Sequence, residues 1–135
     1  MRASSVPLGP MDTQEQIAVA FNEAINARDL DALRALMADG HTFVDSAGTV
    51  VAGTERVLGA WRGFFDAFPD YRNEWAEAIP TRGRVIALGR SVCSTEPDLD
   101  GPAIWSATIT GGKVAEWRVM EDTPANRRRL RIRLK

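Results

Sequence analysis

The stretch AIWSATITGGKVAEWRVME, residues 103–121, predicts two β-strands joined by a tight turn. Gly111 and Gly112 separate two runs rich in β-branched and aromatic residues, and a two-glycine connection is typical of a β-hairpin. Similar runs precede it at residues 71–79 and 85–94. We therefore expect a meander of four antiparallel strands in the second half of the chain.

The first half of the chain has the period of helices instead. Apolar residues recur three or four positions apart in three segments, and Asp12, Asp29 and Thr54 stand where N-caps are expected. A short pair of strands is expected at residues 41–45 and 50–51. Helices followed by a strand meander predict an α+β fold, with N-terminal helices packed on a curved, mostly antiparallel sheet. The space between these layers is the natural place for a pocket.

The length of 135 residues fits one domain with a substantial core. Residues 1–11 lack periodicity, and we interpret them as a flexible leader. Residues 12–126 form the expected domain. Residues 127–135, RRRLRIRLK, are interpreted as a basic C-terminal tail whose charges are solvated. Thr123 and Pro124 predict a short terminal helix just before this tail, as N-cap and first helical residue.

The overall charge and the cysteine content limit the expected partners and compartment. The formal net charge of −1 gives no general attraction to nucleic acid or to an anionic membrane. No apolar run approaches the length that crosses a bilayer, and the N-terminus lacks the apolar core of a signal peptide. A single cysteine, Cys93, suits a reducing compartment. We expect a cytoplasmic protein with no nucleic-acid or membrane partner.

The segment FVDSAG, residues 43–48, places a carboxylate at the end of a predicted strand. Asp45 has two interpretations. It is either a turn residue whose side chain closes the loop, or a general base beside the predicted pocket. The residue type alone leaves both open.

Three runs of the chain resemble a known family: FNEAINARDLDALRALMADGHTFVDSAG, GTERVLGAWRGFFDAFPD and GGKVAEWRVMED. They are similar to the SnoaL-like branch of the nuclear-transport-factor-like superfamily, and the similarity spans roughly residues 13–122, most of the chain. That superfamily includes polyketide cyclases, ketosteroid isomerases and limonene-epoxide hydrolases. The resemblance implies a cone-shaped α+β barrel with an apolar pocket, and commonly a homodimer formed through the sheet. One fold hosts many functions, so the activity must be argued from the site.

The resemblance places Asp45 on the position of the catalytic aspartate of ketosteroid isomerases. The oxyanion donors of those enzymes fall on Phe21 and on Trp105 or Ser106. Phe21 has no donor, Trp105 offers an indole N–H and Ser106 a hydroxyl. The base position is therefore kept while the oxyanion hole is not, and the steroid isomerase mechanism is not expected here.

Two further titratable residues are candidates for proton transfer. Strand alternation places Trp117, Val119 and Glu121 on one face, which the resemblance implies is the pocket face. A slip of one residue would exchange Glu121 for Asp122. His41 shares the strand parity of Asp45 and is either a proton shuttle or a half-exposed surface residue. No spaced His, Cys or acid set accompanies His41, so no metal site is expected.

Aromatic side chains are expected to line the pocket, because the core and the pocket wall lie on the same side of such a sheet. Trp75 is expected to face the convex side, where a dimer partner would cover it. Arg90 stands inside an apolar strand, where it would either bind an anionic or carbonyl oxygen in the pocket or lie on the outer face. The expected lining aromatics are Phe21, Trp61, Phe65, Trp105 and Trp117.

The leading hypothesis is a cofactor-independent cyclase or isomerase of a small apolar carbonyl compound, for instance a polyketide. Asp45 would abstract a proton, Glu121 or His41 would return one, and Trp105 N–H or Arg90 would stabilise the oxyanion. One alternative is water activation of the epoxide-hydrolase type, which uses an Asp-Arg-Asp set. Arg90 is the only candidate for the middle member, and the sequence does not place all three members. The other alternative is a non-catalytic, small-molecule-binding dimer. An accessible cavity beneath two carboxylates favours an enzyme, whereas an interior filled by tryptophans favours the binding module.

Overall fold

The computed structural model describes residues 13–131, in which the helices precede most of the strands, as the sequence predicts. The helices are α1 (Thr13–Ala27), α2 (Leu30–Leu36), α3 (Thr54–Ala67) and α4 (Pro124–Arg129), with a short 3-10 helix η1 (Pro97–Leu99). The strands are β1 (Met37–Val44), β2 (Val50–Ala52), β3 (Arg72–Thr81), β4 (Arg84–Val92), β5 (Gly101–Thr110) and β6 (Lys113–Glu121).

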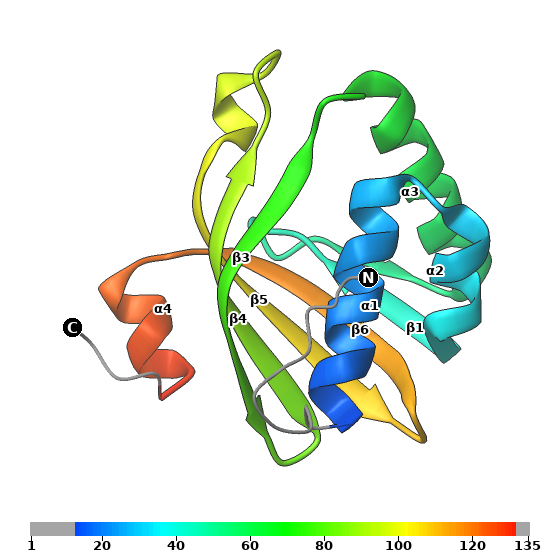
Figure 1. Cartoon of the computed structure of the whole chain (residues 1–135), viewed down its shortest axis with the longest axis vertical. Coiled ribbons are helices and arrows are strands. Elements are labelled where there is room, and N and C mark those ends of the chain that lie inside the picture. Colours follow the sequence, from blue (N-terminus) through cyan, green and yellow to red (C-terminus); the bar gives the residue numbers. More distant parts are fainter. Residues whose placement is uncertain (1–12, 132–135) are drawn as a thin grey trace.

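The strands form one sheet in the order β2-β1-β6-β5-β4-β3. The predicted meander of four antiparallel strands, β3 to β6, is confirmed. β1 adds to its far side by pairing with β6 in parallel, and β2 pairs antiparallel with β1. The α+β class is thus confirmed. The sheet curves without closing, with β2 and β3 at its edges, so the barrel of the resemblance is an open one (Figure 1).

Each face of the sheet carries its own cluster of apolar side chains. On the inner face, Val85 and Ala87 of β4 and Trp105 of β5 join the main core with Phe21 and Ile25 of α1. Figure 1 shows α1, α2 and α3 on this side of the sheet. The apolar faces of these helices pack on this side of the sheet, and a cavity remains between the two layers at one end of the core.

The terminal helix α4 lies away from the other helices (Figure 1). Leu130, just after it, packs on the outer-face cluster of Ile86, Leu88 and Ile104. The predicted cap is confirmed, since Thr123 Oγ1 accepts a hydrogen bond from the Asn126 backbone N–H at 3.1 Å.

The boundary expected before residue 127 falls within α4, because residues 127–129 complete this helix. Residues 132–135, like the expected leader at residues 1–11, lie outside the described residues.

The outer face is where the homodimer is expected to form. Leu130 already packs on part of it, and among residues 13–131 the only large exposed hydrophobic side chain is that of Val50. Dimer formation stays a prediction. None of the helices in the described range is long and apolar enough to cross a membrane.

A β-bulge in β3, between Trp75 and Glu77, changes which side chains face the core. Trp75 faces inward before the bulge, and Ala78 packs on the same core after it. The Trp75 ring stacks on Trp117 with centroids 5.8 Å apart. The expectation that Trp75 faces the convex side is therefore wrong, because the irregular strand places this ring in the inner core.

The bulge depends on a glycine in the neighbouring strand. Gly89 pairs with Trp75, and a Cβ atom at Gly89 would lie 2.0 Å from the Glu74 carbonyl oxygen and 2.9 Å from the Trp75 Cα. Only a residue without a side chain permits so close a backbone approach.

Gly89→Ala should lower the free energy of unfolding by about 1–3 kcal/mol or more, because β3 must move away from β4. Gly63→Ala is the matched control. Gly63 is exposed on α3, a Cβ there meets nothing within 4 Å, and alanine in a helix is favoured by about 1 kcal/mol. Urea unfolding should show opposite effects of the two substitutions. Equal stability of Gly89→Ala and the wild type would show that the bulge tolerates a side chain.

Candidate functional site

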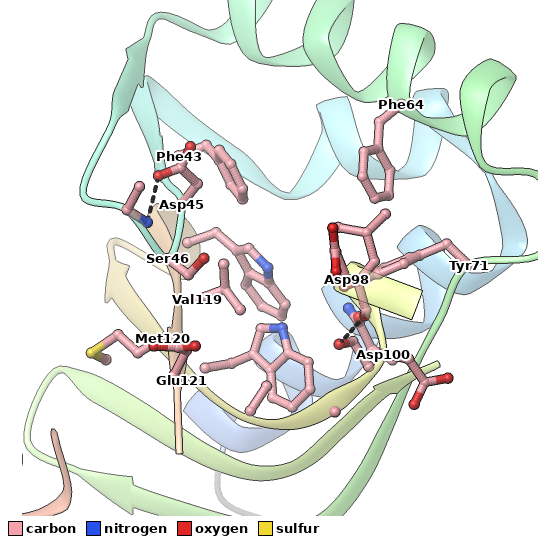
Figure 2. Close-up of a pocket in the computed structure, with 18 of the residues that line it drawn as sticks. Phe43, Asp45, Ser46, Phe64, Tyr71, Asp98, Asp100, Val119, Met120 and Glu121 are labelled. Carbon is pink, nitrogen blue, oxygen red and sulfur yellow. Dashed lines mark hydrogen bonds between the residues drawn. The ribbon is translucent and has the colours of Figure 1, made fainter. Parts of the chain in front are cut away.

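A cavity of about 690 Å³ lies between the inner face of the sheet, α3 and the loops after β1 and β4. Buried aromatic side chains form its floor, with Trp105 and Trp117 each 1% exposed. The side chains around its opening are more exposed, and several are acidic (Figure 2). The acidic lining residues are Asp45, Asp98, Asp100, Glu121 and Asp122.

Asp45 and Glu121 line the same cavity because of the parallel pairing of their strands. Val44, the last residue of β1, pairs with Arg118 of β6, so both strands run toward the same edge of the sheet. Asp45 directly follows β1, and Glu121 ends β6. Figure 2 shows both on one side of the cavity, across from Asp98. The geometry thus brings together the two carboxylates that the sequence singled out.

The Asp45 carboxylate closes the turn after β1. Its Oδ1 accepts hydrogen bonds from the backbone N–H groups of Ala47 and Thr49, both at 2.9 Å. No described residue donates to Oδ2. Asp45 is therefore a turn residue and a lining residue at once, with one carboxylate oxygen available for chemistry.

Glu121 and Asp122 have different surroundings. Asp122 forms a two-point ion pair with Arg127 of α4, at 2.7 and 2.8 Å, and the hydrogen bond from Arg127 holds the Asp122 pKa below its usual range. The Glu121 side chain makes no ion pair within the described residues and is exposed. Both acids line the cavity, but only Glu121 is free of a basic partner there.

His41 does not line the cavity, in contrast to the predicted catalytic role. It is fully buried, and its Nδ1 donates a hydrogen bond to the Val114 carbonyl oxygen at 2.7 Å. Its ring stacks on Phe21, and burial lowers the pKa of His41. His41 shares the inner side of β1 with Phe43, but it lies farther from the cavity and packs beneath α1 instead.

The expected aromatic lining divides in two. Trp61, Trp105 and Trp117 line the cavity as expected. Phe21 and Phe65 are core residues that do not: Phe21 packs on Trp117, and Phe65 stacks on Trp61 from behind the cavity wall. Helical spacing indicated which side chains are buried but not which of them border empty space.

Arg90 lies on the outer face, so the pocket role considered for it is not supported. Val85, Ala87 and Gly89, at the odd positions of β4, are on its inner side. Arg90 is at an even position and therefore faces outward. Its guanidinium binds the Asp100 carboxylate at 2.9 Å and lowers the Asp100 pKa. Arg90 therefore influences the cavity only through an acid that lines it.

Several lining residues were not singled out from the sequence. Tyr71 is buried, and desolvation raises its pKa to about 12, so its hydroxyl is a neutral hydrogen-bond donor. Asn73 is 2% exposed, and its Oδ1 has no hydrogen-bond partner in the described structure. Asp98 and Asp100 come from the loop between β4 and β5, whose acidic composition was the only available signal.

Asp70 holds that loop in place. Its carboxylate accepts hydrogen bonds from the Ser94 hydroxyl, from Thr95 N at 3.1 Å and from Thr95 Oγ1 at 2.8 Å. These hydrogen bonds, Ser94 first, keep the Asp70 pKa far below its usual range. Asp70, at the end of the FPD segment that follows α3, thus positions Asp98 over the cavity.

No three His, Cys, Asp or Glu side chains of residues 13–131 converge in a way that could hold a metal ion. The acids of the cavity are instead distributed around its opening (Figure 2).

Comparison with known proteins gives one family. The model of the SnoaL-like domain matches residues 18–121. No protein of curated function matches the sequence.

Similar solved structures include a candidate SnoaL-like polyketide cyclase of Shewanella putrefaciens, with a TM-score of 0.74, 18% identity and coverage of 97% of this chain and 98% of that chain. A candidate polyketide cyclase of Sinorhizobium meliloti has a TM-score of 0.71 at 20% identity and covers 82% of this chain and 100% of its own. A protein of Catenulispora acidiphila with a ketosteroid isomerase-like fold, solved in complex with trimethylamine, has a TM-score of 0.64 at 20% identity. The match covers 79% of this chain and 85% of that chain.

Burial of neutral His41 should make stability depend on pH. The unfolded histidine titrates near 6.5, and burial lowers the pKa in the folded state. As pH falls below about 6.5, the unfolded chain takes up a proton that the folded chain does not. The free energy of unfolding should then fall by up to about 1.4 kcal/mol per pH unit until the folded pKa is reached.

Urea unfolding at pH 7.5 and pH 5.5 tests this expectation. His41→Asn is the comparison variant, because asparagine can still donate an N–H toward the Val114 carbonyl but does not titrate. The wild type should lose more stability than the variant between the two pH values. An equal loss in both proteins would show that His41 is not responsible.

Proposed function

The chain belongs to the SnoaL-like domain family, and on this premise we propose that it is a cofactor-independent acid/base enzyme of the cyclase or isomerase type. Its substrate would be a small carbonyl-containing metabolite with a largely apolar skeleton. The observation that carries the proposal is that Asp45 and Glu121 share one accessible, aromatic-floored cavity of about 690 Å³. The tryptophans form the floor of this space instead of filling it.

The proposed reaction begins when the free Oδ2 of Asp45 abstracts a proton from the carbon next to the substrate carbonyl. The electron pair of the broken C–H bond moves into the carbonyl and gives an enolate. The buried Tyr71 hydroxyl would donate a hydrogen bond to the enolate oxygen, from the side of the cavity opposite Asp45 in Figure 2. Glu121 would take the proton from Asp45 and return it at another carbon. For a cyclase, the enolate carbon would instead attack a second carbonyl to close a ring, and the protonated acid would give its proton to the alkoxide that forms.

The epoxide-hydrolase alternative has less support. Such a mechanism would use an arginine between two acids, and Arg90 points to the outer face. No arginine is among the described residues that line the cavity.

A non-catalytic binding module remains the second candidate, because one specific observation favours it. The two backbone hydrogen bonds to Asp45 Oδ1 give this residue a structural reason to be an acid or amide, independent of chemistry. The two candidates differ in what Asp45→Asn should do. An asparagine Oδ1 can accept both backbone hydrogen bonds, but the side chain cannot act as a base.

The buried, unpaired Cys93 suits a reducing compartment, so we also propose a cytoplasmic location.

Asp45→Asn should slow carbon–hydrogen exchange by about 100-fold or more while leaving stability close to that of the wild type. The assay follows deuterium incorporation next to the carbonyl of 2-tetralone in D₂O by NMR. Asp66→Asn, an exposed acid on α3 that does not line the cavity, is the matched control and should exchange at the wild-type rate. If the wild type accelerates exchange no more than Asp45→Asn does, Asp45 is not a base and the binding module is preferred.

A further inference from the structure

The charges of the cavity all have one sign. Five carboxylates line it, and no Lys, Arg or His is among the described lining residues. The chain as a whole has a formal net charge of only −1. The negative charge at the cavity is therefore a local feature and not a property of the whole surface.

Two of these five carboxylates are compensated from outside the cavity. Asp100 is bound by Arg90 from the outer face, and Asp122 is bound by Arg127 from α4. The other three, Asp45, Asp98 and Glu121, have no salt-bridge partner within the described residues. A ligand in the cavity is consequently exposed to uncompensated negative charge.

The floor beneath these acids is aromatic. Trp61, Trp105 and Trp117 line the cavity and are at most 8% exposed. The faces of indole rings carry negative potential, and tryptophan is the side chain that attracts organic cations most strongly. Asn73 adds a buried acceptor, since its Oδ1 receives no hydrogen bond in the described chain. That oxygen would suit an N–H⁺ donor.

A metal ion would not fit this arrangement well, because no three potential metal ligands of the described chain converge. Dispersed carboxylates above an apolar floor match a larger ion, whose charge is spread over methyl or methylene groups. An amine with apolar substituents suits both the carboxylates and the aromatic floor beneath them.

We propose that the cavity selects small apolar organic cations, such as protonated tertiary amines, and discriminates against organic anions. Applied to the substrate, the proposal rests on the proposed function. The carbonyl compound on which Asp45 and Glu121 act then carries a basic amine. Carboxylated and phosphorylated metabolites are excluded by repulsion from Asp45, Asp98 and Glu121.

Three probes of similar shape and different charge test the proposal by binding alone. They are protonated N,N-dimethylbenzylamine, its neutral isostere isobutylbenzene, and the anion phenylmethanesulfonate. Titration at pH 7, followed through the tryptophan indole N–H signals in NMR spectra, should show the cation binding at least about tenfold more tightly than the neutral probe. The anion should give no saturable shift.

Variants then locate the source of the preference. Asp98→Asn combined with Glu121→Gln should weaken binding of the cation by about tenfold and change binding of isobutylbenzene by less than about twofold. Glu23→Gln is the matched control, because it removes one exposed carboxylate on α1 that does not line the cavity. This control should leave the affinity for the cation unchanged.

Several outcomes would overturn the inference: no saturable shift with the cation, equal affinity for the neutral isostere, tighter binding of the anion, or equal weakening by Glu23→Gln. Failure of the enzyme proposal is distinguishable from these. Absence of 2-tetralone exchange together with a retained preference for the cation would reject the catalytic role and keep the charge selectivity. Exchange that requires Asp45 without any preference for the cation would reject the inference alone.

Discussion

The parallel pairing of β1 with β6 determines where the cavity lies and which side chains surround it. The meander from β3 to β6 would form a sheet without β1, but it would lack the wall that carries Phe43 and Asp45. Because neighbouring parallel strands end at the same edge, the acid after β1 and the acid at the end of β6 meet there. β2 and α3 come directly after β1 in the chain, so the cavity wall that they form depends on the same pairing.

The cavity combines a hydrophobic floor with a polar opening, and different elements maintain each part. Stacking of Trp75 on Trp117 stabilises the floor, and the bulge next to Gly89 allows that stacking. Hydrogen bonds to Asp70 hold the β4–β5 loop over the opening, and the Arg127 ion pair holds the chain after β6. Side chains outside the cavity thus determine where its acids lie.

Periodicity and turn residues were sufficient to predict the fold class, the meander and the capped terminal helix. They placed Asp45 and Glu121 at strand ends, and the resemblance to the SnoaL-like family implied that both acids face the pocket. The predictions for His41 and Trp75 were wrong. Parity gave the side of β1 on which His41 lies but not its distance from the cavity, and Trp75 lies next to a register shift that alternation cannot anticipate. The choice between the pocket and the outer face for Arg90 required knowing which residues of β4 face inward. Tyr71 and Asp98 were not found because their relation to the cavity comes from contacts between distant segments, such as Asp70 with Thr95.

The pairing of β1 with β6 also has a consequence for the order in which the protein folds. The strands of the meander are joined by short connections, whereas β1 must pair positions 43 and 117 across most of the chain. Closing such a long loop costs chain entropy before any contact compensates for it, so contacts of this kind form late. We expect β3 to β6 to pair before β1 joins β6, so that the site is completed late in folding. A ligand that stabilises the cavity would then act chiefly by slowing the detachment of β1.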